Sequence, residues 1–207
     1  MNHLLKYSLL LACIVMLGAC QENAEDTLPY IGNHPNPDAG EYHRVKDFSF
    51  INQDSVIVTQ EDFAGKAYVV DFFFTSCPTI CPKVKQQMLR VYEQFADENQ
   101  LLFLSHTVDP KYDTPERLKA YAEKLDINTE KWHLVTGTQE ELHGISDDYM
   151  SIALENADAP GGFDHSGRLI LVDADRHIRA FCNGTNPEEV TDFMKDVEKL
   201  LNEMDKG

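Results

Sequence analysis

Hydrophobic residues along this chain fall into short continuous runs that alternate with longer, spaced patterns. Residues 67–74 are almost wholly apolar, as expected for a central strand covered on both faces. Residues 101–104 and 132–135 predict two more buried strands, and residues 56–58 predict a short one. The runs therefore predict a sheet with residues 67–74 near its middle.

Helical patterns follow several of these runs. Residues 82–96 carry apolar side chains at helical spacing and predict an amphipathic helix. Thr114 and Asn186 are each followed by proline, the arrangement of a capping residue before the first turn, so a helix is predicted after each. Residues 167–181 predict a hairpin that turns at residues 173–175.

The order of these elements predicts the fold class. Alternating strands and helices favour an α/β fold: a central mixed β-sheet flanked by helices, with a late β-hairpin and a C-terminal helix. In such sheets, functional groups collect where a strand ends and the next helix begins. The segment after Phe74 is therefore the first place to look for a site.

The composition excludes several classes of protein. Lys and Arg total 18 against 35 Asp and Glu, a net charge of -17, and so acidic a surface repels phosphate backbones and excludes nucleic acid as a partner. With 207 residues, 43% of them hydrophobic, the chain is an ordinary globular protein. Its apolar stretch at residues 4–17 is shorter than the roughly 20 residues of a spanning helix, which excludes a polytopic membrane protein.

The amino terminus has the pattern of a signal peptide. Lys6 gives the positive flank, residues 9–17 give the apolar run, and small residues precede Cys20. The ending Leu-Gly-Ala-Cys resembles the lipobox of bacterial lipoproteins, in which the cysteine is acylated and becomes the first mature residue. We therefore predict a signal peptide at residues 1–19 and a lipid on Cys20; an ordinary secretory signal with an incidental cysteine is the alternative.

The segment after Cys20 predicts a spacer. Residues 21–42 are rich in Asn, Pro and acidic residues and lack apolar periodicity. We predict a lipid-anchored flexible tether over residues 20–42 and one domain over residues 43–207. The lipid would hold the domain at a membrane of the bacterial cell envelope, outside the cytoplasm on the periplasmic side.

Cys77 and Cys81 stand four residues apart at the predicted start of a helix. The helix dipole and unpaired N–H groups there stabilise thiolate, so both sulfurs are predicted to be unusually acidic. Residues four apart on a helix have Cβ atoms about 5–6 Å apart. This spacing allows a shared metal ion or, with adjustment, a disulfide, and geometry alone does not choose between them.

Four motifs in a fixed order carry a family resemblance. DFFFTSCPTICPKV at residues 71–84, VDPKYDTPERLKAY at 108–121, WHLVTG at 132–137 and DHS at 164–166 resemble the Sco/SenC family of copper-binding, thioredoxin-like proteins. The resemblance extends from Asp47 to the C-terminus. It implies a thioredoxin-like fold, copper as Cu+ or Cu2+, and a role in metallating the dinuclear copper centre of a cytochrome c oxidase subunit.

The family's copper ligands fall on Cys77, Cys81 and His165 when carried over position by position. Thiolates suit reduced copper and an imidazole accepts the oxidised ion, so this donor set suits a carrier of either. Three ligands also leave copper accessible to an incoming ligand from an acceptor. The chain departs from the common family pattern at Ser76 and residues 79–80, and neither departure removes a ligand.

Asp109, Asp164 and His106 are candidates for groups that orient the copper ligands or tune their basicity. Each has a structural alternative, since the carboxylates also suit turn caps and His106 also suits the core. Asp71 lies in an apolar strand, where a charge needs a partner. Cys182 is left over after the pair, and burial is the simpler explanation for it.

Two functions of different classes are the main alternatives. The first is a membrane-tethered copper chaperone, which has no catalytic residue, requires a thiol reductant and delivers to a copper-accepting oxidase subunit. The second is a thiol-disulfide reductase that keeps the acceptor's cysteines reduced, with Cys77 and Cys81 as its redox pair. Redox enzymes of this fold usually carry CxxC and do not need His165, so the spacing favours a metal site.

Two further functions are alternatives to these. A thiol peroxidase is disfavoured because Phe74 stands where those enzymes carry Thr or Ser. A copper or redox sensor without a transfer step stays open.

Overall fold

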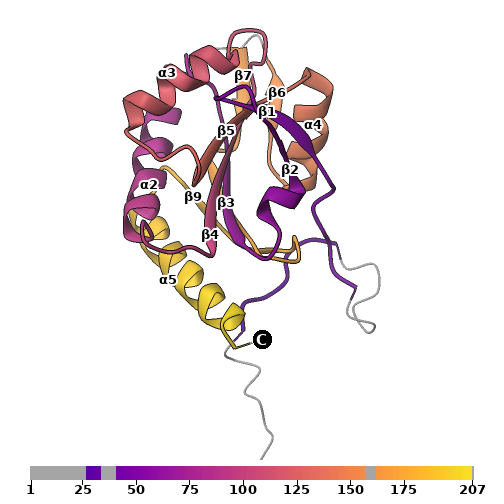
Figure 1. Cartoon of the computed structure of the whole chain (residues 1–207), viewed down its shortest axis with the longest axis vertical. Helices are drawn as coiled ribbons and strands as arrows, with labels where there is room; N and C mark the ends of the chain where they lie inside the picture. The colour runs from indigo at the N-terminus through magenta and orange to yellow at the C-terminus, as the bar shows by residue number, and fades with distance from the viewer. Residues whose placement is uncertain (1–26, 34–40, 157–161, 207) are drawn as a thin grey trace, which may run out of the picture.

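The computed structural model describes residues 27–33, 41–156 and 162–206, with the backbone alone for residues 153–155, 164 and 165. Seven strands form one mixed sheet in the order β2-β1-β5-β4-β3-β8-β9 (Figure 1). A separate two-stranded sheet pairs β6 with β7. The strand bounds are β1 Ser49–Asn52, β2 Ile57–Thr59, β3 Ala67–Phe73, β4 Leu101–Thr107, β5 Trp132–Thr136, β6 Ala153–Glu155, β7 Phe163–His165, β8 Arg168–Val172 and β9 Ile178–Asn183.

The centre of the sheet is parallel. Strand β3 runs parallel to β4, and β4 runs parallel to β5, while β8 pairs with the other edge of β3 in the antiparallel direction. Every residue of β3 is buried, which confirms the prediction of a central strand covered on both faces. Because β3 and β4 are parallel, the loops that follow them leave from the same end of the sheet.

Helices cover both faces of the sheet. Figure 1 shows α2, α3 and α5 on one side and α4 on the other. Among the described helices, none is both long and apolar enough to cross a membrane. The helix bounds are α2 Cys81–Gln94, α3 Pro115–Leu125, α4 Gln139–Asp148 and α5 Pro187–Met204, with a short 3-10 helix η2 at Gln60–Phe63.

The predicted helix starts and late hairpin are confirmed. The Thr114 side chain accepts a hydrogen bond from the Arg117 amide at the start of α3, and the Asn186 side chain accepts one from Glu188 at the start of α5. Strands β8 and β9 form the hairpin, with Asp173 accepting the amide hydrogen bonds of its turn. Local capping and turn chemistry therefore act as the sequence indicates.

Four features were not predicted: β1, η2, α4 and the β6–β7 hairpin. Helix α4 carries four acidic residues and Gly144, so its buried stripe is narrow and its helical pattern weak. The strands of the small hairpin have three residues each, too few to show a period-two pattern. Their pairing is set by tertiary contacts rather than by local sequence.

Part of the predicted tether belongs to the domain. Within the described residues 27–33, Leu28 is buried and Ile31 forms a β-bridge with Ile178 at the edge of the sheet. The Arg179 guanidinium donates to the backbone oxygens of Leu28 and Pro29. A domain boundary at residue 43 is therefore too late, because edge-strand pairing and a buried arginine hold this segment. The signal peptide and Cys20 lie outside the described residues.

Candidate metal centre

The cysteine loop connects β3 to α2 across residues 74–80. The Cys77 amide donates to the backbone oxygen of Phe74 at 3.2 Å, which turns the chain immediately after the strand. Helix α2 begins at Cys81, and the Cys81 amide donates to the Cys77 sulfur at 3.5 Å. Both are thiols in this structure, with 8% and 3% of their surfaces exposed. The helix start thus brings the two sulfur-bearing residues together at the carboxyl end of β3.

The two thiols differ in acidity. Burial raises the pKa of Cys77, but hydrogen bonds from the Cys81 thiol and from the Thr79 and Cys81 amides outweigh it and lower that pKa below its ordinary value. Burial, reinforced by the neighbouring Cys77, raises the pKa of Cys81. The prediction that both sulfurs are acidic is therefore wrong for Cys81, because one thiol donates the hydrogen bond that the other accepts.

A buried carboxylate anchors the front of the loop. Asp113 is fully buried and accepts hydrogen bonds from the Thr75 amide at 3.0 Å, from the Thr75 hydroxyl and from the Thr107 hydroxyl at 2.6 Å. It thus ties the cysteine loop to the end of β4 and the start of α3. Sequence reasoning did not single it out, although it lies inside the VDPKYDTP motif.

A buried ion pair lies beneath the same loop. Lys85 of α2, one turn after Cys81, donates to both carboxylate oxygens of Asp71 at 2.8 Å and to the Ser105 hydroxyl at 2.7 Å. Trp132 donates to the same hydroxyl at 2.8 Å, and the Lys85 ammonium lies 4.0 Å from the centroid of Phe73. Asp71 therefore has the partner that its apolar strand requires. Lys85 was missed because it lies on the buried stripe of α2, where a lysine is rare.

Two contacts bring the strand of His165 to this loop. Phe163, two positions before His165 in β7, packs its ring 5.2 Å from that of Phe74. Gly167, two positions after His165, has a positive φ of +61°, and a Cβ there would lie 3.1 Å from the Ile80 side chain. The Phe163 ring before His165 and the Gly167 backbone after it therefore both lie close to the loop that carries Cys77 and Cys81.

The other residues predicted near the ligands have different surroundings. The Asp109 carboxylate accepts a hydrogen bond from the Tyr112 amide within a turn, the structural alternative for this residue. Asp164 pairs its backbone with Leu154 in the small hairpin. Cys182 is buried in β9, and burial raises its pKa to about 12. The surroundings of Asp109 therefore match its alternative as a turn cap, and those of Cys182 match its expected burial.

His106 faces an aromatic cluster. Its ring stacks on Phe72 with centroids 5.1 Å apart and meets Phe50 edge-on at 5.0 Å. Ser105, the preceding residue of β4, points to Lys85, so His106 points to the opposite face of the sheet. Burial, followed by the charge of Lys85, lowers its pKa to about 3. A role for His106 beside the cysteines therefore gains no support from its position.

Tyr121 of α3 completes the surroundings of the loop. Its ring packs 5.5 Å from that of Phe73. Burial raises its pKa, and the nearby charges of Asp71, Cys81 and Cys77 raise it further. Among the described side chains, to which that of His165 does not belong, no three His, Cys, Asp or Glu groups converge as metal ligands.

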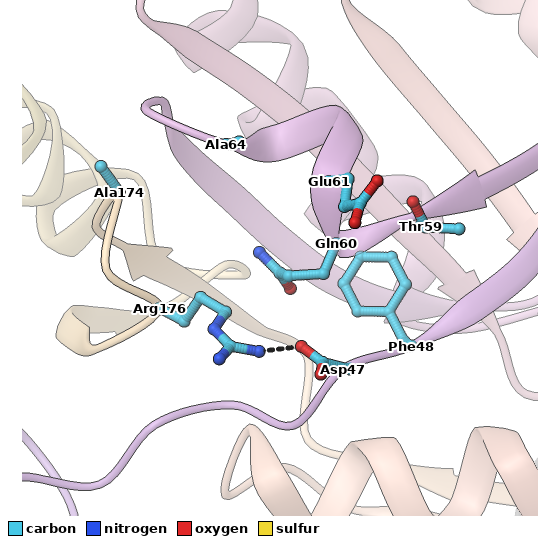
Figure 2. Close-up of a pocket in the computed structure, with 8 residues that line it drawn as sticks. All are labelled: Asp47, Phe48, Thr59, Gln60, Glu61, Ala64, Ala174 and Arg176. Carbon is cyan, nitrogen blue, oxygen red and sulfur yellow. Dashed lines mark hydrogen bonds and ion pairs between the residues drawn. The ribbon is translucent and has the colours of Figure 1, made fainter.

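A cavity of about 500 Å³ lies at the other end of the sheet (Figure 2). Ala64 precedes β3 and Ala174 lies in the β8–β9 turn, so the cavity is at the amino end of β3, whereas the cysteine loop follows its carboxyl end. An ion pair between Arg176 and Asp47 closes one side, as the dashed line in Figure 2 marks. The cavity is thus separate from the cysteine site.

Fold and site together define the class: a thioredoxin-like α/β domain whose central strand ends in a CxxxC loop. The chain belongs to the SCO1/SenC family, because the family model of that description matches residues 36–202. The fold and the family predicted from the four motifs are therefore confirmed.

Three solved structures illustrate the similarity. A SCO1/SenC family lipoprotein from Bacillus anthracis is 30% identical with a TM-score of 0.69, covering 76% of this chain and 95% of its own. BsSco, described as a member of the Sco family of cytochrome c oxidase assembly proteins, is 26% identical with a TM-score of 0.67 over 83% and 98%. Arabidopsis thaliana ScoI, solved with copper bound, is 22% identical with a TM-score of 0.64 over 76% and 98%, and shares the fold.

Proposed function

We propose that this protein is a copper chaperone, which binds one copper ion through Cys77, Cys81 and His165 and delivers it to the dinuclear copper site of a cytochrome c oxidase subunit. The observation that carries the proposal is that the Phe163 ring before His165 packs on Phe74 of the cysteine loop, while Gly167 after it lies close to Ile80 of the same loop. Copper in the Arabidopsis ScoI structure and the assembly role of the BsSco family support it.

The donor set suits the cargo. Two thiolates favour Cu+, and one imidazole allows the same site to accept Cu2+. A three-coordinate ion remains open to an incoming thiolate of the acceptor, so ligands can be exchanged one at a time. Thiolate and neutral imidazole are the binding forms, so copper displaces protons and its affinity falls on acidification.

A copper titration tests the proposal. The reduced protein should bind one ion, and Cys77→Ser, Cys81→Ser and His165→Ala should each lose much of the affinity. Oxidation to a Cys77–Cys81 disulfide should abolish binding, since both sulfurs are then consumed. His143→Ala on α4 is the matched control and should bind as the wild type. Binding that survives oxidation, or that does not change between pH 8 and 5, would contradict this ligand set.

A thiol-disulfide reductase is the second candidate, and the acidity difference between the thiols favours it. An acidic Cys77 beside a less acidic Cys81 is suited to attack by one sulfur and resolution by the other. A reductase should reduce a mixed disulfide of the acceptor at the same rate with His165→Ala as with the wild type. A chaperone should lose copper transfer in that variant.

We further propose that a lipid on Cys20 holds the domain at a bacterial membrane, on the periplasmic side. The lipoprotein description of the Bacillus anthracis relative supports an anchored form. In cells, Cys20→Ser should move the protein from the membrane fraction to the soluble fraction. An unchanged distribution would show that another feature anchors the chain.

A further inference from the structure

A groove of about 570 Å³ lies beside the cysteine loop. Thr75, two positions before Cys77, forms one wall, and the exposed face of α3 forms the other. Ala120 leaves the middle of the groove open, and Tyr121 at its base packs against Phe73 at the end of β3. The groove therefore borders the loop that carries the two thiols.

The groove carries positive charge on an acidic protein. Arg117 and Lys124 are exposed in its lining, together with one carboxylate, that of Glu116. Over the described residues, neither cation forms an ion pair, whereas the neighbouring Lys119 is paired with Asp54 at 3.1 Å. Two cations thus stand unpaired in a chain with 35 acidic and 18 basic residues.

Contacts within the protein already restrict the side chains of Arg117 and Thr75 that line the groove. The Arg117 guanidinium lies 3.6 Å from the centroid of Tyr112, which restricts its movement. Thr75 is fixed by its hydrogen bonds to the buried Asp113. A groove with ordered walls loses little conformational entropy on binding.

We propose that this groove binds an acidic segment of the protein that accepts the copper, next to the acceptor's own copper ligands. The inference rests on the proposed function, because it names the partner of that site. An acidic chain repels carboxylates, so unpaired cations in the groove that borders the cysteine loop determine where, and in which orientation, an acidic segment docks. The segment then lies within reach of the ion as ligands exchange.

Binding of the acceptor tests this inference apart from copper. The probe is the copper-free soluble domain of the copper-accepting oxidase subunit from the same organism. Lys124→Glu should raise its dissociation constant about tenfold at low salt, with a smaller effect at about 0.5 M salt because screening shortens the range of the interaction. Lys66→Glu makes the same charge change just before β3, at the far end of that strand, and should bind as the wild type.

A second variant tests the shape of the groove. Ala120→Phe fills its middle and should weaken acceptor binding at both salt concentrations, while the copper affinity of both groove variants stays within about twofold of the wild type, because no copper ligand is touched. Acceptor binding that is absent in the wild type, or unchanged in Lys124→Glu and Ala120→Phe, would overturn the inference. If both variants weaken acceptor binding as expected but the copper titration shows no binding through Cys77, Cys81 and His165, the proposed function alone would be overturned.

Discussion

At the residue scale, Cys77 and Cys81 share one loop but differ in their hydrogen bonds. The Cys77 sulfur accepts from the Cys81 amide at 3.5 Å, whereas the Cys81 thiol is more deeply buried. The sequence predicts an acidic pair because both residues stand at a helix start. It cannot predict which sulfur donates and which accepts, since that depends on the turn made by residues 74–80.

This difference predicts the order of alkylation. In the copper-free reduced protein, iodoacetamide should react first with Cys77, because its lowered pKa gives more thiolate near neutral pH. The rate should rise with pH to a midpoint below the ordinary cysteine range, and Cys77→Ser should remove the fast phase. Peptide mapping identifies the modified residue. Faster modification of Cys81 or Cys182 would show that the assignment is wrong.

The ion pair of Lys85 with Asp71 predicts a large stability effect. Lys85→Met leaves the Asp71 carboxylate buried without its cation, and such a loss typically costs about 3–5 kcal/mol. Urea unfolding measures the free energy. Lys195→Met is the control, because Lys195 and its partner Asp192 are exposed, so its free energy of unfolding should stay close to that of the wild type. A loss below about 1 kcal/mol in Lys85→Met would show that Asp71 does not need this partner.

At the element scale, the proposed copper site depends on the position of β7 and of the residues that follow it. Gly167 joins β7 to β8 at a positive φ of +61°, and a Cβ at this position would lie 3.1 Å from the Ile80 side chain just before α2. Its backbone oxygen accepts from the Gly184 amide at 2.8 Å. The connection after His165 is therefore fixed by close backbone packing that only glycine provides at low cost.

Two glycine substitutions with opposite effects test this connection. Gly167→Ala should lower stability by about 1–2 kcal/mol, because a Cβ is strained at positive φ and meets Ile80. It should also weaken copper binding. Gly144→Ala in α4 has open space around the new Cβ and should raise stability by about 0.5–1 kcal/mol. Thermal unfolding measures the melting temperature of each variant against the wild type. Equal changes in melting temperature for the two variants would contradict the packing described at Gly167.

The sequence predicts elements well where the signal is local. Strand β3, the capped starts of α3 and α5 and the β8–β9 hairpin all follow from apolar runs, caps and turn residues. Helix α4 and the three-residue strands of the small hairpin are not predicted by such local signals, because tertiary contacts determine them. The same limit applies to the site, since Asp113 and Lys85 act through partners far away in sequence.

At the scale of the whole molecule, the proposed site joins two distant parts of the chain. The spacing of Cys77 and Cys81 indicates a dithiol, and the family motifs add His165. The parallel β3–β4 pair, the contact of Phe163 with Phe74 and the packing of Gly167 explain how the second part reaches the first. The groove beside α3 places Arg117 and Lys124 next to the cysteine loop in a chain with a net charge of -17.

X-ray absorption at the copper edge tests the central claim most directly, because it counts the sulfur and nitrogen neighbours of the bound ion. The wild type loaded with one copper should show two sulfur ligands and one imidazole nitrogen. His165→Ala should lose the imidazole contribution and keep both sulfurs, while His143→Ala should keep all three. A spectrum of His165→Ala that is identical to the wild type would contradict the account.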